Sequence, residues 1–395
     1  CTMTLVMISG TVSLYLGTES VTETRTPADW TSTLTFCPAE GDEPDFEALT
    51  ERVEAVAAAQ GVPAMDSFGF LSASQTQYLW DGVLDTCPVD ETGAIGAEVA
   101  CLFLTADAYG VLTGKPVSLE ADEVLVWTSQ PLSDTLTLTY RNYIPEEPGG
   151  EPRTFRIKAF LDTFPATGGW SPMIGAANAG LDGICAVVSD EAVLLDLYDQ
   201  YRLAYGSLSM NWTLFTTLSG TDAEKLDAYN AAFVNFEDGA YPDFTGTGSW
   251  TAFSTESKQM NLAESYNLNG GFFFLGVFLG VLFLMAAVLI IYYKQISEGY
   301  EDRQRFQIMQ QVGLERRQIK RSINRQILVV FFLPLLAAAL HLLFDFRLMV
   351  LLLQLFAMTD VKLTAICSLL TFGVFAALYV LVYRITARSY YKIVS

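Results

Sequence analysis

The chain has 395 residues, of which 51% are hydrophobic and 17% are charged, and its formal net charge is −21. Soluble domains carry about 25% charged residues, so this chain is poor in charge. The acidic balance argues against nucleic-acid binding, which needs clustered basic residues. His341 is the single histidine of the sequence, which argues against a Ser-His-Asp triad and against any multi-histidine metal centre. We therefore expect no catalytic site and no metal site.

The charge is distributed unevenly along the chain. Residues 1–270 contain 10 Lys and Arg and 38 Asp and Glu, a net charge of −28. Residues 271–395 contain 13 Lys and Arg and 6 Asp and Glu, a net charge of +7. This asymmetry predicts two regions in two different environments.

Residues 1–17 form an uncharged, apolar run. They lack an initiator methionine, a basic flank and a small-residue cleavage site, so we expect a truncated transmembrane helix rather than a signal peptide. A lipid-modified Cys1 is the alternative. Ser9, Ser13 and Gly17 recur every four residues, a spacing of small residues that lets two helices approach closely.

Residues 18–269 have the composition of a folded domain of mixed α and β structure. Helices are predicted at residues 45–60, 191–205 and 223–236. Strand-like runs occupy residues 68–71, 99–104, 123–127, 135–140, 154–160, 183–188, 208–217 and 250–254. Because helices and strands alternate, we expect layers of an α/β fold.

Four cysteines lie in this domain. Cys37 and Cys87 both precede a proline in loop-like sequence, and they are the candidate disulfide pair of an oxidising compartment. Cys101 and Cys185 lie in apolar strand runs and are expected to be buried free thiols.

Three further apolar runs are long enough to cross a membrane, at residues 272–293, 327–344 and 363–383. With residues 1–17, they predict an α-helical membrane protein with four spans, the first of them truncated. Gly276 and Gly280 form a GxxxG pattern. Their functional interpretation is contact with the first span or with another subunit, and chance is the alternative because glycine is frequent in such helices.

The positive charges predict the orientation of these spans. Residues 294–326 carry eight Lys and Arg and the tail 384–395 carries three, which together are 11 of the 13 in this half. Loops rich in Lys and Arg lie in the cytoplasm. Residues 345–362 are then an external loop with an interfacial helix, and residues 18–269 are extracytoplasmic.

The connector at residues 294–326 is the most specific feature of the sequence. Phe306, Met309 and Val312 form a narrow apolar stripe, Gly313 interrupts the helix, and Ile319 resumes the stripe. We interpret the connector as amphipathic coupling helices that transmit force to a cytoplasmic partner. The alternative is an interfacial helix that binds only the anionic headgroups of membrane lipid.

Residues 303–319 resemble the signature of FtsX-like ABC transporter permeases, in which a basic, apolar helix is followed by a short V/L-G turn and a second basic helix. Val312, Gly313, Leu314 and Ile319 match that turn. The fuller run at residues 290–306, with the FFLPLLAA and ARSYYKIVS segments, looks like the Bce-type subgroup of peptide-antibiotic exporters and sensors. Gln307 departs from the acidic residue often found there, which puts a salt bridge with the ATPase in doubt.

The resemblance implies a non-catalytic permease subunit of a bacterial cell membrane. ATP would be bound by a dimer of a separate ATPase subunit, so no cofactor is expected on this chain. Phe306, Met309, Val312, Gly313 and Arg316 would contact that ATPase. The resemblance further implies a peptide antibiotic or lipid-linked wall precursor as ligand, and a sensor histidine kinase as partner.

Two other classes of protein remain open. One is an FtsX-like or MacB-like protein that regulates a wall hydrolase or moves lipoproteins, since its external domain also precedes the last three spans. The other is a membrane sensor that works without an ATPase and would not need the connector.

Overall fold

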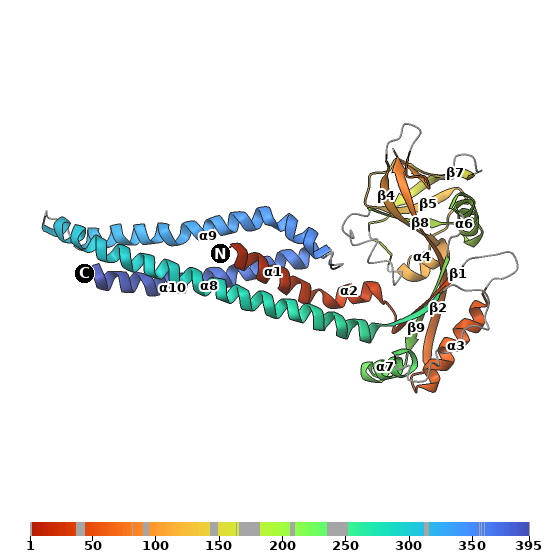
Figure 1. The fold of residues 1–395 in the computed structure, drawn as a ribbon, viewed down its shortest axis with the longest axis horizontal. Coiled ribbons are helices and arrows are strands. Elements are labelled where there is room, and N and C mark those ends of the chain that lie inside the picture. The colour runs from red at the N-terminus through yellow and green to blue at the C-terminus, as the bar shows by residue number, and fades with distance from the viewer. Residues whose placement is uncertain are drawn as a thin grey trace. The chain divides into compact units, whose positions relative to one another are not determined.

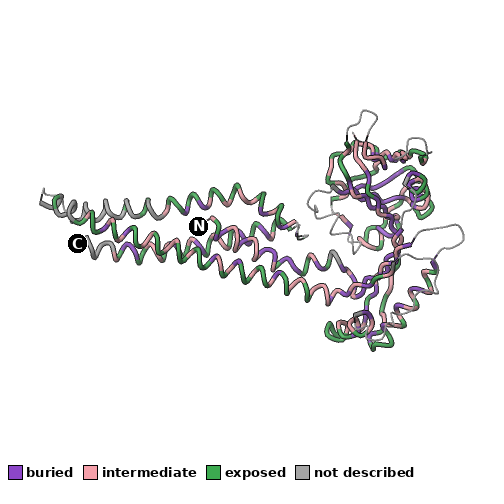
Figure 2. Tube along the Cα trace, viewed as in Figure 1, coloured by how far each residue is buried: buried purple, intermediate pink, exposed green. Residues whose placement is uncertain are grey.

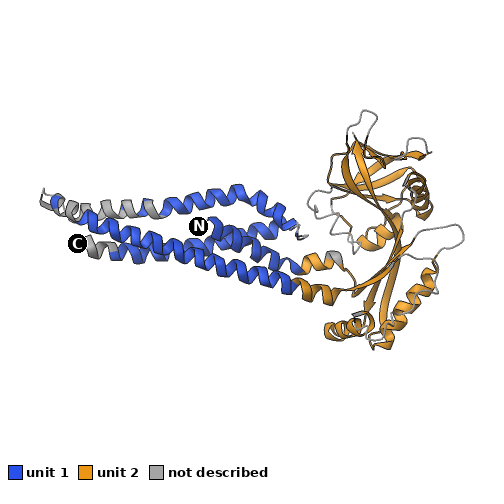
Figure 3. Ribbon diagram, in the orientation of Figure 1, with its two compact units in different colours: residues 1–18, 266–395 blue, residues 19–265 orange. Residues whose placement is uncertain are grey.

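The chain folds into two compact units, coloured separately in Figure 3. The computed structural model describes residues 2–36, 44–80, 82–89, 95–142, 149–162, 164–165, 182–205, 210–234, 252–311, 316–354, 356, 358 and 360–394. Unit 1 consists of Cys1–Thr18 and Tyr266–Ser395, and unit 2 consists of Glu19–Ser265.

Unit 1 is helical. It contains α1 (Thr2–Leu16), most of α8 (Lys258–Gln311), α9 (Arg316–Gln354) and α10 (Val361–Val394), which run side by side in Figure 1. By length and composition, three segments could cross a membrane: Lys258–Arg303, Phe332–Gln354 and Val361–Ser389. The three spans predicted in the second half of the chain therefore fall on three long helices. At 15 residues, α1 is shorter than a span requires, and the fourth span stays a prediction.

The external loop predicted at residues 345–362 differs from the structure. Helix α9 continues without a break to Gln354 and includes Pro334. Residues 345–354 thus extend the preceding helix and do not form a separate interfacial helix. Asp345 and Arg347 had suggested a boundary, but isolated charges do not interrupt the hydrogen-bond ladder of a helix flanked by leucine-rich sequence.

Unit 2 is rich in β structure. Its strands are β1 (Trp30–Phe36), β2 (Ala64–Trp80), β3 (Val83–Asp85), β4 (Ala97–Thr105), β5 (Glu123–Thr128), β6 (Thr135–Tyr140), β7 (Gly150–Phe160), β8 (Asp182–Val188), β9 (Met210–Leu218) and β10 (Ala252–Ser257). Its helices are α2 (Thr18–Arg25), α3 (Phe46–Ala59), α4 (Ala106–Thr113), α6 (Glu191–Tyr205) and α7 (Asp222–Tyr229), followed by a π-helical turn at Asn230–Val234.

The long strand β2 belongs to two parts of one sheet. Its first half pairs with β9 over Ala64–Ala73, beside β1 and β10. Its second half pairs with β4 over Ser72–Leu79 and with β3 over Tyr78–Trp80. The order β2-β3-β6-β7-β5-β8-β4 returns to β2, so these strands close into a ring. The prediction of α/β layers is therefore wrong in its layering: the strands form one continuous, partly closed sheet.

Helices cover this sheet as the apolar spacing predicted. Helix α3 buries Leu49, Val53 and Ala57 and begins at Asp45, whose carboxylate accepts a hydrogen bond from Ala48 N at 2.9 Å. Helix α6 buries Leu194, Leu197, Tyr198 and Tyr201 in the same core. The two helices agree with the predicted ranges. Figure 2 shows buried residues concentrated along the strands of unit 2.

Candidate functional site: helix contacts, connector and a buried carboxylate

Close helix contacts in unit 1 involve the two glycines of the GxxxG pattern. A Cβ at Gly276 would overlap the Thr11 side chain of α1, and one at Gly280 would lie 2.7 Å from the Ile8 side chain. Tyr15 of α1 stacks on Phe273 of α8 with ring centroids 5.1 Å apart. Helices α1 and α8 therefore meet where both glycines leave room for the partner helix.

The small residues predicted on α1 do not face those glycines. Ser9 and Ser13 are fully buried, and their hydroxyls donate to Leu5 O and Ser9 O at 2.6 and 2.7 Å. They lie at spacings of four from Leu5, which packs in a core with α9 and α10 residues. A Cβ at Gly17 would overlap the Met358 side chain. The serines satisfy their own hydroxyls within α1 and act as small packing residues.

Two polar contacts join helices of unit 1. Asn269 Nδ2 donates to Thr18 Oγ1 at 2.9 Å, and both residues are buried. Thr2 Oγ1 lies 3.1 Å from His341 Nδ1. His341 falls near the middle of the candidate span Phe332–Gln354.

The described parts of the connector are helical, at the end of α8 and the start of α9, and the helix break predicted at Gly313 stays a prediction. Phe306 and Met309 lie on α8, which ends at Gln311, and Arg316 begins α9. Val312 and Gly313 lie outside the described residues. The assignment of these five residues to an ATPase contact stays a prediction.

A buried carboxylate in unit 2 was not predictable from any sequence pattern: Asp29 joins four segments of the chain. Its oxygens accept hydrogen bonds from Leu218 N at 2.8 Å and from Lys225 Nζ and Gln259 Nε2 at 2.9 Å each. Its backbone oxygen accepts from Lys258 N at 2.9 Å. Asp29 therefore ties the start of β1 to β9, to α7 and to the first turn of α8.

The environment of Asp29 favours its charged form. Only 12% of the Asp29 side chain and 13% of the Lys225 side chain are exposed. Burial alone would raise the pKa of Asp29, but the hydrogen bonds from Leu218, Lys225 and Gln259 and the charge of Lys225 together hold that pKa below its usual value. The pair is thus a charged clamp, and Asp29 also binds the first turn of α8 through Lys258 and Gln259.

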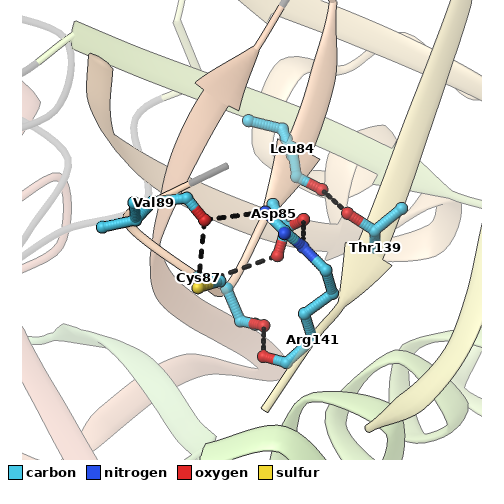
Figure 4. A network of polar contacts seen from close by, with 7 residues as sticks. Leu84, Asp85, Cys87, Val89, Thr139 and Arg141 are labelled. Carbon is cyan, nitrogen blue, oxygen red and sulfur yellow. Dashed lines mark hydrogen bonds and ion pairs between the residues drawn. The ribbon is translucent and has the colours of Figure 1, made fainter. Parts of the chain in front are cut away.

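A second polar network holds the loop that contains Cys87 (Figure 4). Arg141 Nε donates to Asp85 Oδ2 at 2.6 Å, and Cys87 N donates to Asp85 Oδ1 at 2.9 Å. The Cys87 thiol lies 3.3 Å from Val89 O. Cys37 lies outside the described residues, so the Cys37–Cys87 pairing stays a prediction.

The other two cysteines of unit 2 are free and fully buried, as predicted from their apolar strands. Cys101 and Cys185 lie on β4 and β8, which pair in parallel. Burial raises the pKa of both thiols well above the usual range. They are packing residues of the strand core.

Comparison with known proteins gives one partial similarity over a short stretch of the chain. No protein-family model matches the chain. A stretch of 74 residues is 32% identical to the "ABC transporter permease protein YxdM" of Bacillus subtilis (strain 168), which covers 19% of this chain and 12% of that protein. The match therefore covers well under two thirds of the relative. With three helices long enough to cross a membrane, the similarity supports a membrane protein of the ABC permease kind in general.

Proposed function

We propose that the chain is the permease subunit of an ABC transporter whose ATPase is a separate polypeptide. The observation that carries the proposal is the strongly basic connector at residues 294–326, whose described parts are the end of the long helix α8 and the start of the long helix α9. A partner that binds this segment can move both helices together. The similarity to a permease supports the same class.

The proposal extends to the ligand. In the Bce-type subgroup that the connector resembles, the work of the ATPase frees lipid-linked wall precursors from peptide antibiotics and signals to a sensor histidine kinase. We propose the same role here, in a bacterial cell membrane with unit 2 outside. The net charge of −28 over residues 1–270 is compatible with a cationic peptide as ligand.

The first experiment purifies the protein with the ATPase encoded beside it and measures ATP hydrolysis in lipid discs. Peptide antibiotics and their lipid-linked targets are added separately and together. A change in hydrolysis with the antibiotic or its complex supports the proposal. Hydrolysis that ignores both would favour a wall-hydrolase regulator or lipoprotein mover, and the absence of any associated ATPase would favour an ATPase-independent sensor.

A substitution in the connector tests the coupling role directly. Gly313→Val places a β-branched residue in the predicted break, and we expect loss of antibiotic protection with normal insertion in the membrane. Gly373→Val on α10 is the matched control, because a Cβ there meets no atom within 4 Å. Protection that survives Gly313→Val would contradict the coupling role.

A further inference from the structure

Unit 2 contains a cleft of about 280 Å³ beside β2. Its walls are formed by residues 68–71 of β2, by Phe46 of α3, by Trp212 of β9, and by the first turns of α4 and α6 with Asp107 and Glu191. The volume is near the lower limit of ligand pockets, about 300 Å³. It suits one side chain and the backbone beside it rather than a large ligand.

The cleft reaches the backbone edge of β2. Side chains of successive strand residues point to opposite faces, so a cavity that touches four consecutive residues must approach the strand from its edge. On one side, residues 64–73 pair with β9. On the other side, pairing with β4 begins only at Ser72, opposite Leu104. Among the described strands, none pairs with residues 64–71 on that side.

The open edge of β2 at residues 68–71 results from the place where β4 ends. Strand β4 ends at Thr105, where the chain turns into α4. The hydroxyl of Thr105 caps that helix by accepting a hydrogen bond from Ala108 N at 3.2 Å. The cleft therefore occupies the position in which β4 would have continued beside residues 68–71.

Aromatic rings form one wall of the cleft. The Trp212 indole stacks on Phe46, with ring centroids 5.2 Å apart and an interplanar angle of 18°. It also lies directly over Gly69, where a Cβ would be 2.7 Å from Trp212 Cζ2. Glycine at this position lets the indole approach the strand and keeps the wall flat.

Two acidic residues also line the cleft. Asp107 and Glu191 are exposed, and neither has an ion-pair partner in the part of the chain that the structure describes. Acidic residues in the first turn of a helix also favour the helix dipole. However, each helix is already capped by another residue: Thr105 caps α4, and Asp190 Oδ1 accepts a hydrogen bond from Val193 N of α6 at 3.0 Å. Among the described residues, the cleft lining contains no lysine or arginine.

We propose that this cleft binds an extended, basic peptide segment that pairs with the open edge of β2 at residues 68–71. Backbone hydrogen bonds to the strand edge hold the segment. One of its lysine or arginine side chains lies between the aromatic wall and the carboxylates of Asp107 and Glu191, where a cation is attracted both by ring faces and by the acids. The inference rests on the proposed function only for the source of the peptide, since the site lies within unit 2.

The binding test uses the full chain in phosphatidylcholine discs without the ATPase. The probe is a fluorescent hexapeptide of alternating lysine and threonine, and binding is followed by fluorescence anisotropy. We expect Asp107→Asn with Glu191→Gln to weaken binding at least about fivefold, because two ion pairs are lost. Asp134→Asn with Glu98→Gln is the matched control: it removes the same charge from exposed positions outside the cleft and should leave affinity unchanged. A hexapeptide of glutamate and threonine should not bind.

Backbone pairing is tested with two further probes, N-methylated at either the odd or the even amides. Only alternate amides of a strand point to its neighbour, so one methylated probe should lose binding and the other should retain it. The inference would be overturned if the two methylated probes bound equally well. It would also be overturned if the control variant weakened binding as much as the cleft variant, or if the unmethylated lysine–threonine hexapeptide did not bind. If the double variant unfolds, Phe68→Ala serves in its place.

The test separates this inference from the proposed function. If the wild-type chain associates with the ATPase but does not bind the lysine–threonine peptide, this site alone is overturned. If the chain binds the peptide but does not associate with an ATPase, the proposed function alone is overturned.

Discussion

At the scale of single residues, the charge of Asp29 decides how the first turn of α8 is held. Its carboxylate has three donors and the backbone oxygen has a fourth. We expect Asp29→Asn to lower the free energy of unfolding by about 3 kcal/mol, because Lys225 is left as a largely buried cation without its counter-ion. Denaturant unfolding of the detergent-solubilised protein measures this change.

The Asp199–Arg202 pair provides the control for that prediction. Both side chains are about half exposed, at 59% and 48%, with 3.7 Å between the charged atoms. Arg202→Gln should therefore change the free energy of unfolding by less than about 0.5 kcal/mol. A loss as large as that of Asp29→Asn would show that the effect follows from surface charge and not from the buried clamp.

The lowered pKa of Asp29 predicts how the free energies of unfolding of the wild type and of Asp29→Asn depend on pH. The folded state holds this carboxyl below the usual value of about 3.9, so it binds fewer protons than the unfolded state in this range. The stabilisation is complete above the unfolded pKa and is lost as pH falls through the folded pKa. The difference between the wild type and Asp29→Asn should therefore shrink as pH falls below about 4. Unfolding midpoints measured at several pH values check this, and a difference independent of pH would contradict it.

At the scale of helices and strands, the glycines of α8 illustrate what a sequence pattern can predict. The GxxxG spacing predicted close helix contact, and the structure brings Gly276 and Gly280 against α1. The identity of the facing residues could not be predicted. It depends on the rotation of α1, which is fixed by Leu5 and its neighbours in the core with α9 and α10.

Substitution of Gly276 tests this contact. Gly276→Leu forces a side chain into Thr11, and we expect a loss of about 1–3 kcal/mol from overpacking. Gly271→Leu is the matched control on the same helix, because a Cβ there meets no atom within 4 Å. Thermal unfolding in detergent compares the two variants. Equal stability of both would contradict close packing between α1 and α8.

The strands of unit 2 show where prediction from sequence ends. Runs such as residues 123–127 and 135–140 were predicted because β-branched and apolar residues are dense there, and β5 and β6 confirm them. Strand β1 (WTSTLTF) was not predicted, although apolar and polar residues alternate along part of it. The closed ring of strands could not be predicted from the sequence. Strand β2 continues well past the apolar residues 68–71, and one of its partners, β9, is distant in sequence.

The candidate site was predictable to different extents. The helix break at Gly313 is predicted from local sequence alone and stays a prediction, because Gly313 lies outside the described residues. The Asp29 clamp and the cleft beside β2 were not predictable, because both join residues that are far apart in the chain. No spacing in the sequence connects Asp29 with Lys225, or Phe68 with Glu191.

At the scale of the whole molecule, the two units differ in the environment that their surfaces require. In the candidate spans, only 11%, 17% and 22% of the most apolar windows are buried within the protein. Those apolar surfaces require lipid or further helices. Unit 2 instead has its own core, with Trp30, Leu49, Val126 and Leu214 almost completely buried. Its stability should therefore not depend on the membrane.

This contrast predicts that residues 19–265 fold alone. We expect the fragment to be soluble and monomeric and to unfold in one cooperative thermal transition, because its core and the whole Asp29 clamp lie within it. A shorter fragment of residues 30–257 keeps that core but lacks Asp29, Lys258 and Gln259. It should melt at a clearly lower temperature.

Size-exclusion chromatography and circular dichroism on both fragments provide the measurements. If the longer fragment aggregates or melts without cooperativity, unit 2 is not independent; if both fragments melt together, the clamp does not stabilise it.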